Sequence, residues 1–344
     1  MMNVNKNLVN ILTPVYNGAE YIPRLLDSVL IQTYPKVEMF VIDDGSTDNT
    51  EQVVASYIPR FEKKGYILHY TYQENAGQNA AINRALKWVN GEYLLYPDSD
   101  DWYKTCDAIA IMVDALNSYG SEVGVARCQF EMIEAETGKI INRTSFTPCD
   151  TPMDLFEDAY YGREGFYYAP IEFILKANVI DDYIKDREIF VNRHIGQNCQ
   201  ILLPYFANSK CVTINKVLGC YLVRKNSHSH TPLDYNNSLF QNLATQNCFE
   251  YTMSSLKVFK EDWKERLLKD KRKALCKGRM DLAVEYERTA DFRKNYISYR
   301  CITDKIDVKY YRLWLWTFLF PIRLYKKCLR LASYSKLHMH KKDK

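Results

Sequence analysis

The chain carries three carboxylates within four positions, Asp98, Asp100 and Asp101, directly after a run of apolar and aromatic residues that stops at Pro97. Such a run is typical of a buried strand that opens into a loop. Carboxylates this close repel one another, so each favours its protonated form unless a cation or several N–H donors compensate. A divalent metal is the simplest compensation, because Mg²⁺ and Mn²⁺ prefer oxygen ligands. An Asx turn or a helix N-cap at the strand end is the alternative interpretation.

The elements that must position these carboxylates alternate between strand and helix. Apolar stretches predict the strands, and apolar residues three or four positions apart predict the helices between them. The predicted strands cover 8–13, 37–42, 66–72 and the run before Asp98, and the predicted helices cover 20–32, a segment from about 47, and 80–89. This alternation predicts an α/β fold with a mostly parallel central sheet that helices cover on both faces.

Polar side chains follow three of the predicted strands. Tyr16 and Asn17 follow the first strand, Asp43 and Asp44 follow the second, and Asp98 opens the acidic loop after the fourth. Ligands of parallel sheets bind outside the carboxyl ends of the strands, so we expect these loops to form one site. Alternatively, Asp43 and Asp44 form an Asx turn with a helix cap, and Tyr16 is a core residue. Neither a dinucleotide-binding GxGxxG motif nor a Walker loop is present.

Four short motifs in this region resemble family 2 glycosyltransferases in their order and spacing. The motifs are Thr13-Pro14-Val15-Tyr16-Asn17, Gln32-Thr33-Tyr34, Val41 to Asp48, and Gly91-Glu92-Tyr93 leading to Asp98-Ser99-Asp100-Asp101. The resemblance is strong over roughly 8–105 and weaker over 106–230. It implies a GT-A fold, in which one α/β domain binds a nucleotide sugar. It also implies a hexosyltransferase-type enzyme that transfers the sugar with inversion.

The resemblance implies a role for each matching residue. Tyr16 is expected near the base, Asp44 accepts the imide N–H of that base, and Asp98 faces the ribose or a metal. Asp100 is expected to hold the Mn²⁺ or Mg²⁺ that bridges the diphosphate, and UDP is the expected nucleotide. The full predicted nucleotide-sugar site comprises Pro14, Tyr16, Asn17, Asp43, Asp44, Asn75, Gly77, Asn83, Asp98, Ser99 and Arg224.

The predicted acceptor side departs from the family pattern. Members often carry a Glu-Asp pair after a glycine that opens a helix, whereas this chain has Gln197 and Asn198 after Gly196. Neither amide can act as a general base at neutral pH. The two amides and Trp102 are predicted acceptor contacts, although helix initiation by polar surface residues explains the amides equally well. Candidate bases are Asp101 and, on weaker grounds, Glu172, Asp182 and Glu188. The alternative is a nucleotide-sugar-binding partner subunit that has lost transfer.

The segment 221–230 resembles a Tyr-Arg…Ser-x-Ser segment that follows the last strand in many family members. The resemblance implies that Arg224 contacts the diphosphate and that His228 completes the metal shell. An exposed polar loop with unengaged imidazoles is the alternative.

The composition is that of a soluble globular protein, with 344 residues of which 47% are hydrophobic and 26% charged. Ten scattered cysteines without a CxxC motif favour reduced thiols. Met1 to Asn7 lead directly into the first strand, so we expect no signal peptide and a cytoplasmic protein. The predicted division is a glycosyltransferase domain over 1–235, a helical appendage over 236–304 and a basic, aromatic tail over 305–344.

The tail holds 11 Lys and Arg against two Asp, and its aromatic stretch 310–323 is too short to span a bilayer. Trp, Tyr and Phe side chains flanked by basic residues suit the headgroup boundary of an anionic membrane. We therefore predict peripheral binding to the inner face of the cell membrane, with a buried core helix as the alternative. Nucleic acid is not an expected partner, because the aromatic residues form one block. A glycan or lipid-linked glycan acceptor in polysaccharide biosynthesis would fit such a location.

Overall fold

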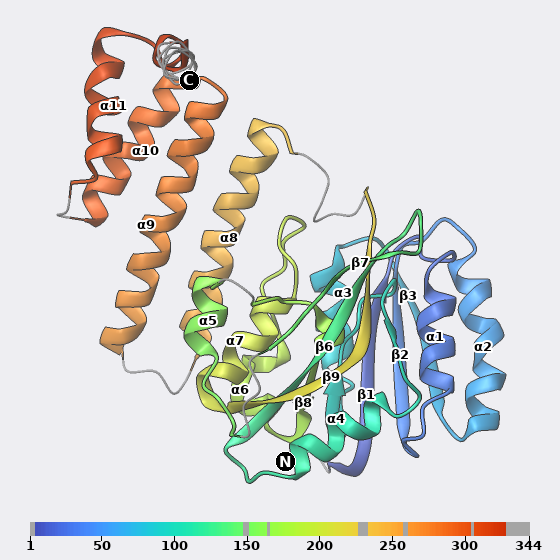
Figure 1. Ribbon diagram of the computed structural model, residues 1–344. Coiled ribbons are helices and arrows are strands. Elements are labelled where there is room, and N and C mark those ends of the chain that lie inside the picture. Colours follow the sequence, from blue (N-terminus) through green and yellow to red (C-terminus); the bar gives the residue numbers. More distant parts are fainter. Residues whose placement is uncertain are drawn as a thin grey trace, which may run out of the picture. The chain divides into compact units, whose positions relative to one another are not determined.

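The computed structural model describes residues 4–146, 151–163, 166–225, 233–256, 261–303 and 306–327 (Figure 1). The contacts divide the chain into two compact units. The first unit comprises Met1–Thr231 and Tyr251–Phe259, and the second comprises Pro232–Glu250 and Lys260–Lys344. Helix α8 (Tyr235–Ser255) contributes residues to both. The predicted three-part division with boundaries at 235 and 304 stays a prediction.

The described part of the first unit is built on a nine-stranded sheet with the strand order β3-β2-β1-β4-β8-β6-β9-β5, and β7 pairs with β6. Its N-terminal half is parallel, as predicted, so the polar loops after these strands reach one edge of the sheet. The parallel strands are β1 (Asn5–Val15), β2 (Val37–Asp44), β3 (Ile67–Gln73) and β4 (Gly91–Leu95).

The other half of the sheet is mixed, which refines the prediction of a mostly parallel sheet. Its strands are β5 (Trp102–Tyr103), β6 (Val123–Glu134), β7 (Ile140–Arg143), β8 (Phe173–Lys176) and β9 (Lys210–Val223). Strand β8 is antiparallel to both β4 and β6, whereas β6 and β9 are parallel. The predicted α/β class is confirmed, and the antiparallel β8 joins the parallel half to the mixed half.

Helices pack on the parallel half of the sheet because their apolar residues recur at helical spacing. In α1 (Ile22–Leu30) the buried residues include Ile22, Leu25, Leu26 and Val29. The α3 helix (Gln78–Leu86) contacts β1 and β2, and α2 (Thr50–Lys64) contacts β3. The α2 helix begins later than predicted, because Asp48 accepts hydrogen bonds from the Thr50 amide and hydroxyl and the preceding residues form a loop.

Short helices connect the strands of the mixed half. They are α4 (Ala108–Asn117), α5 (Phe156–Tyr161), η1 (Pro170–Glu172), η2 (Ala177–Val179), α6 (Ile180–Tyr183), η3 (Lys185–Arg187) and α7 (Asn198–Asn208). A continuous core of buried residues, including Ile11, Leu25 and Ile174, runs beneath both halves. The loops at the carboxyl ends of the strands therefore rest on a rigid base.

The second unit is helical, which confirms the predicted appendage. Besides part of α8 it contains α9 (Glu261–Glu285), α10 (Thr289–Ile302) and α11 (Val308–Leu319). Its core includes Met280, Phe292, Tyr296, Tyr310 and Leu313. No helix in the described ranges is both long and apolar enough to cross a membrane.

Candidate nucleotide-sugar site

The loops after β1 and β2 are fastened to each other. The Asn17 amide donates to Ser46 Oγ at 2.8 Å, and the Thr47 amide donates to Asn17 Oδ1 at 2.8 Å. Asn17 has a φ of 49°, a left-handed conformation that asparagine tolerates better than most residues. Next to this pair, Tyr16 is held with 55% of its surface exposed. Tyr16 is therefore not a core residue, and its ring is available to a ligand.

Asp43 is a buried structural carboxylate. Its Oδ1 accepts the Ser46 amide at 2.7 Å, and its Oδ2 accepts the Tyr70 hydroxyl at 2.7 Å. The side chain is thus satisfied by the protein on both oxygens, as the Asx-turn interpretation anticipated. Gly45 completes the turn with a φ of 84°, and a Cβ there would lie only 2.8 Å from the Asn75 nitrogen. This close approach brings residues 75–77 against the end of β2.

Asp44 organises that adjoining segment. Its Oδ1 accepts the Ala76 amide at 2.9 Å and the Gln73 amide side chain at 2.8 Å, and its Oδ2 accepts the Gly77 amide at 2.8 Å. Asn75 donates to the Asp44 carbonyl at 2.8 Å. A carboxylate has about four lone-pair positions, so three bonds leave about one for a ligand. The base-binding role implied for Asp44 is possible only through that remaining position.

Two consecutive residues connect Asp44 to the acidic loop after β4. Gly77 bonds Asp44, and the next residue, Gln78, donates through Nε2 to Asp98 Oδ1 at 2.8 Å. Gln197 Nε2 donates to the same Asp98 oxygen at 3.2 Å. Desolvation and the neighbouring Asp100 carboxylate raise the pKa of Asp98 to about 7. Asp98 thus lies at the centre of the site, within reach of both halves of the sheet.

The other two carboxylates of the loop have different surroundings. Asp100 Oδ2 pairs with Arg224 Nη2 at 2.7 Å. Asp101 is fully buried, its Oδ1 accepts the Leu222 amide at 3.1 Å, and its Oδ2 has no hydrogen-bond partner among the described residues. Burial, together with Asp100 and Asp98, raises the pKa of Asp101 well above its ordinary value. Asp101 therefore favours its protonated form when no cation is present.

The segment 189–198 is clamped onto α3 by side-chain amides. Asn83 donates to the Ile189 carbonyl at 2.9 Å and accepts the Ile189 amide at 2.8 Å. Asn79 donates to the carbonyls of Phe190 and Ile195 at 3.0 and 2.9 Å. Both Nδ2 and Oδ1 of Asn83 thus bond the backbone of Ile189. The structure therefore gives Asn83 a supporting role, and its predicted contact with the nucleotide sugar stays a prediction.

This clamp places the two predicted acceptor amides beside the carboxylates. Gln197 is buried and reaches Asp98, while Asn198 Nδ2 donates to the Tyr168 carbonyl at 2.6 Å. Gln197 Oε1 and Asn198 Oδ1 are buried, and neither finds a donor within the described part of the chain. Two unsatisfied carbonyl oxygens are unfavourable in the protein alone, so a bound molecule with hydroxyl or N–H donors is their natural partner.

The structure brings one of the four candidate bases to the cluster, namely Asp101. Glu188 pairs with Lys87 at 2.8 Å, beyond the C-terminal end of α3, and Asp98 is bonded at the N-terminal end. Asp182 is exposed on α6. Glu172 is buried, and burial raises its pKa well above its usual range. Glu188 therefore does not join the carboxylates at Asp98, whereas Glu172 and Asp182 stay predictions.

The remaining predicted residues line the site or its support. Thr13, beside Pro14 in β1, donates through Oγ1 to the Pro97 carbonyl at 3.2 Å. Ser99 lies opposite Gly18, where an added Cβ would be 3.6 Å from Ser99 Oγ. Trp102 is partly exposed, with the Arg24 guanidinium carbon 4.6 Å from its ring centroid. His228 lies outside the described residues.

The donor set fits a hard divalent cation that shares its shell with a ligand. In the described ranges, no three His, Cys, Asp or Glu side chains converge to hold a metal by themselves. Asp100, with Asp98, supplies carboxylate oxygens, and Mg²⁺ commonly takes one or two carboxylates with substrate phosphates completing its shell. The residues present therefore suit a cation that arrives with a diphosphate.

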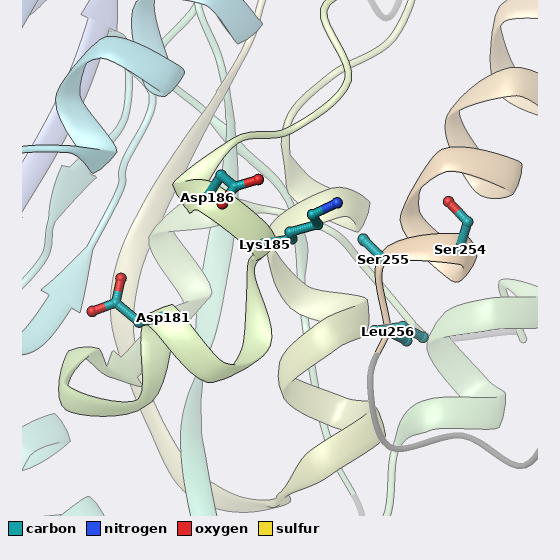
Figure 2. Close-up of a pocket in the computed structure, with 6 residues that line it drawn as sticks. All are labelled: Asp181, Lys185, Asp186, Ser254, Ser255 and Leu256. Atoms are coloured by element: carbon teal, nitrogen blue, oxygen red, sulfur yellow. The ribbon is translucent and has the colours of Figure 1, made fainter.

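Figure 2 shows a cavity of about 560 Å³ that none of the predicted site residues lines. Its lining residues are Asp181, Lys185, Asp186, Ser254, Ser255 and Leu256. Asp181 pairs with the buried Arg187, which also donates to the carbonyls of Leu86, the last residue of α3, and of Val89. The cavity and the carboxylate cluster therefore lie at opposite ends of that helix.

Comparisons with known proteins agree with this geometry. Residues 10–166 match the family described as Glycosyl transferase family 2. A putative teichuronic acid biosynthesis glycosyltransferase, TuaG of Bacillus subtilis, is 41% identical over 100 residues, which is 29% of this chain and 38% of TuaG. The chain spans 40% or less of the length of the first curated relatives that it matches.

Two solved structures share the fold. S. aureus TarS 1–349 in complex with UDP-GlcNAc is 18% identical with a TM-score of 0.56, covering 86% of this chain and 90% of TarS. The mannosyltransferase PcManGT of Pyrobaculum calidifontis, in complex with GDP-Man and Mn²⁺, is 16% identical with a TM-score of 0.51, covering 95% and 86%. The motifs, the arrangement of the sheet and the family match agree, and residues 10–166 therefore hold a domain that matches glycosyltransferase family 2.

Proposed function

We propose that this protein transfers a sugar, with inversion, from a UDP-sugar to a glycan or lipid-linked glycan acceptor in polysaccharide biosynthesis, with a divalent metal. The observation that carries the proposal is the chain of contacts from Asp44 through Gly77 and Gln78 to Asp98. These contacts link the carboxylate proposed to accept from the base, at the end of β2, to the acidic loop proposed to hold the metal, after β4; β1 lies between the two strands. The exposed Tyr16 ring beside Asp44 supplies a face on which a base can stack.

The leaving group explains the acidic loop. Negative charge grows on the diphosphate as the glycosidic bond breaks, so a cation placed against it stabilises the transition state more than the ground state. Asp100 and Asp98 would hold Mn²⁺ or Mg²⁺, which supplies that charge when bound. The fold shared with a mannosyltransferase in complex with GDP-Man and Mn²⁺ supports this assignment.

The acceptor side needs a base on the opposite face of the sugar. Asp101 is our candidate, because its buried Oδ2 has no partner in the described part of the chain. A cation held at the neighbouring Asp100 would favour the carboxylate form of Asp101 that a base requires. Gln197 and Asn198 would orient the acceptor through the carbonyl oxygens that lack donors. Trp102 offers an aromatic surface to a sugar ring.

The experiment compares Asp100→Asn with Glu188→Gln, which removes one carboxylate charge far from the cluster. We expect UDP affinity in Mn²⁺ to fall at least about tenfold for Asp100→Asn, a loss typical of a carboxylate–cation contact, and to stay within twofold for Glu188→Gln. Equal affinities for the two variants would refute the assignment. A thermal-shift screen of nucleotide sugars with Mn²⁺ then identifies the donor.

A second candidate function rests on the same amides. Because Gln197 and Asn198 replace an acidic pair, the protein could bind nucleotide sugar as an inactive partner subunit. Turnover with a lipid-linked acceptor distinguishes the two candidates. Tight UDP-sugar binding without turnover across donors favours the partner subunit, and product formation excludes it.

We also infer that the second unit binds the anionic inner face of the cell membrane, through the outer side of α11. Leu315, Phe318 and Leu319 are 44%, 59% and 78% exposed, and the neighbouring Arg312 and Arg323 are exposed too. A wide apolar surface with basic neighbours suits an acidic lipid interface.

The two tryptophans of this stretch are partly buried against the core of the second unit, so they expose less surface than Leu315, Phe318 and Leu319. Trp314 stacks on Tyr296 with ring centroids 5.3 Å apart, and Trp316 packs near Tyr325 at 5.9 Å. Their indole nitrogens are buried because α11 covers the core of this unit. Truncation after residue 305 would remove that cover, so it is a poor test of membrane binding.

Surface substitution is the better test. We expect the double variant Phe318→Ser, Leu319→Ser to lose binding to vesicles that contain acidic phospholipid, while its UDP affinity is unchanged. Binding of the unaltered protein should also weaken with added salt, because part of it is electrostatic. Retention of the variant on the vesicles would refute the inference.

A further inference from the structure

Arg224 forms an ion pair with Asp100, the carboxylate that the proposed function assigns to the metal ion. Its Nη2 is 2.7 Å from Asp100 Oδ2, and the side chains are 34% and 16% exposed, so the pair is only partly screened by solvent. Arg224 follows the last residue of β9, and its guanidinium carbon lies 4.6 Å from the ring centroid of Tyr21, just before α1. The cation is therefore held between an aromatic face and the acidic loop.

The guanidinium is not fully satisfied in this arrangement. Its Nε is buried and has no acceptor among the residues that the structure describes. An arginine offers five N–H donors in a fork that matches carboxylates and phosphates. A diphosphate beside Asp100 would supply additional oxygens, whereas the protein alone leaves one donor unused.

We propose that Arg224 stands in for the metal at Asp100 and moves to the diphosphate when the metal–nucleotide complex binds. This rests on the proposed function, because it assumes a nucleoside diphosphate and a divalent cation at the same site. Asp100 Oδ2 pairs with the guanidinium, so a metal that takes this oxygen must displace Arg224, and the two cations compete for it while no nucleotide is present. When the diphosphate binds, its oxygens attract both the metal ion and the Arg224 guanidinium, so the two cations then stabilise the same ligand.

The proposal predicts that substituting Arg224 raises the affinity for Mn²⁺ alone and lowers the affinity for UDP in Mn²⁺. In Arg224→Gln, Mn²⁺ alone should bind about threefold to tenfold more tightly. The reason is that the partly exposed ion pair between Arg224 and Asp100, which competes with Mn²⁺, is lost. UDP in saturating Mn²⁺ should bind about tenfold more weakly, because a charge-assisted contact to the diphosphate is lost. A purely structural role for Arg224 would weaken both.

The matched control is Lys225→Gln. Lys225 is the next residue and carries the same charge, but its side chain is 77% exposed and its carboxylate neighbour is Glu136 at 3.8 Å. We expect this variant to change neither affinity by more than twofold. Arg224→Lys, which keeps the charge, should return the affinity for Mn²⁺ alone towards that of the unaltered protein.

Mn²⁺ binding is measured from the electron paramagnetic resonance signal of the free ion, and UDP binding by calorimetry. Unchanged or weaker binding of Mn²⁺ alone by Arg224→Gln refutes the stand-in role, and unchanged UDP affinity refutes the transfer to the diphosphate. If the unaltered protein binds no UDP in Mn²⁺, the proposed function fails instead. The measurement with Mn²⁺ alone still decides whether Arg224 competes at Asp100.

Discussion

Replacing Asp98 with asparagine is expected to change how the stability of the ligand-free protein depends on pH. Asp98 lies among carboxylates at the end of β4, and burial with the nearby Asp100 raises its pKa to about 7, from 3.8 for an ordinary Asp side chain. The folded protein therefore holds a proton on Asp98 over a range in which the unfolded chain has released it. Stability falls with rising pH wherever the folded state binds more protons, so Asp98 becomes progressively more unfavourable between about pH 4 and pH 7.

The magnitude follows from the size of the shift. A difference of about three pKa units corresponds to about 4 kcal/mol, accumulated between pH 4 and 7 and constant above pH 7. The substituted amide carries no charge at any pH and keeps a carbonyl oxygen that can accept from Gln78 and Gln197, as Asp98 does. The variant should thus gain stability over the unaltered protein as the pH rises. Because the three acidic residues titrate together, this difference reports the cluster and not Asp98 alone.

The assay is a set of thermal melts of both proteins from pH 4.5 to 8.5 in the presence of a chelator. At about 2–4 °C per kcal/mol for a unit of this size, we expect the midpoint of Asp98→Asn to rise relative to the unaltered protein by on the order of 10 °C between pH 4.5 and 7.5. Little further change is expected above pH 7.5. A difference that stays constant across this range, or that shrinks as the pH rises, would refute the assignment of a raised pKa.

Four further substitutions test other parts of the structure. Tyr16→Ala should change the melting temperature by no more than about 1 °C, because the residue is 55% exposed. If the base stacks on this ring, the substitution should weaken UDP binding by about 1–3 kcal/mol, which calorimetry measures. An unchanged UDP affinity would exclude stacking. Asn83→Ala removes both hydrogen bonds to Ile189, so it should lower the free energy of unfolding of the first unit by about 1–3 kcal/mol. It should also speed amide hydrogen exchange in 189–198. Unchanged exchange would show that Asn83 does not hold this segment. Leu313→Ala should destabilise the second unit by about 2–5 kcal/mol in urea unfolding, whereas Leu319→Ala on the outer side of α11 should be nearly neutral; similar losses would contradict the assigned faces.

Much of the parallel half could be predicted from the sequence, because each apolar run there ends at polar residues. The carboxyl ends of parallel strands meet at one edge, so the loops at Tyr16, Asp44 and Asp98 were expected together. The contact between Gln78 and Asp98 could not be predicted, because a glutamine at the start of a helix is common and carries no special signal. The ion pair between Arg224 and Asp100 could not be predicted either, because these residues lie far apart in the chain.

The C-terminal stretch shows a different limit of sequence reasoning. The α11 helix is apolar or aromatic on most of its circumference, so periodicity does not reveal which side faces the core. The structure buries Tyr310, Leu313 and Thr317 and leaves Leu315 and Leu319 exposed. The buried-helix interpretation describes the inner side, and membrane binding through the outer side stays a proposal. In the mixed half of the sheet, the antiparallel β8 is similarly beyond prediction, because a strand of four residues, three of them apolar, carries no sign of strand direction.

The contact of Gly77 with Asp44 and of Gln78 with Asp98 has a consequence for engineering. Gly77 bonds Asp44, and the next residue, Gln78, bonds Asp98 and begins α3. Asp44 and Asp98 are therefore joined through two consecutive residues at the start of this helix. Any change at Asp44 made to accept a different base will shift the helix end that supports the acidic loop. Under the proposed function, we therefore expect nucleotide preference and sugar-transfer rate to change together, and altering one without the other to require compensating changes in α3.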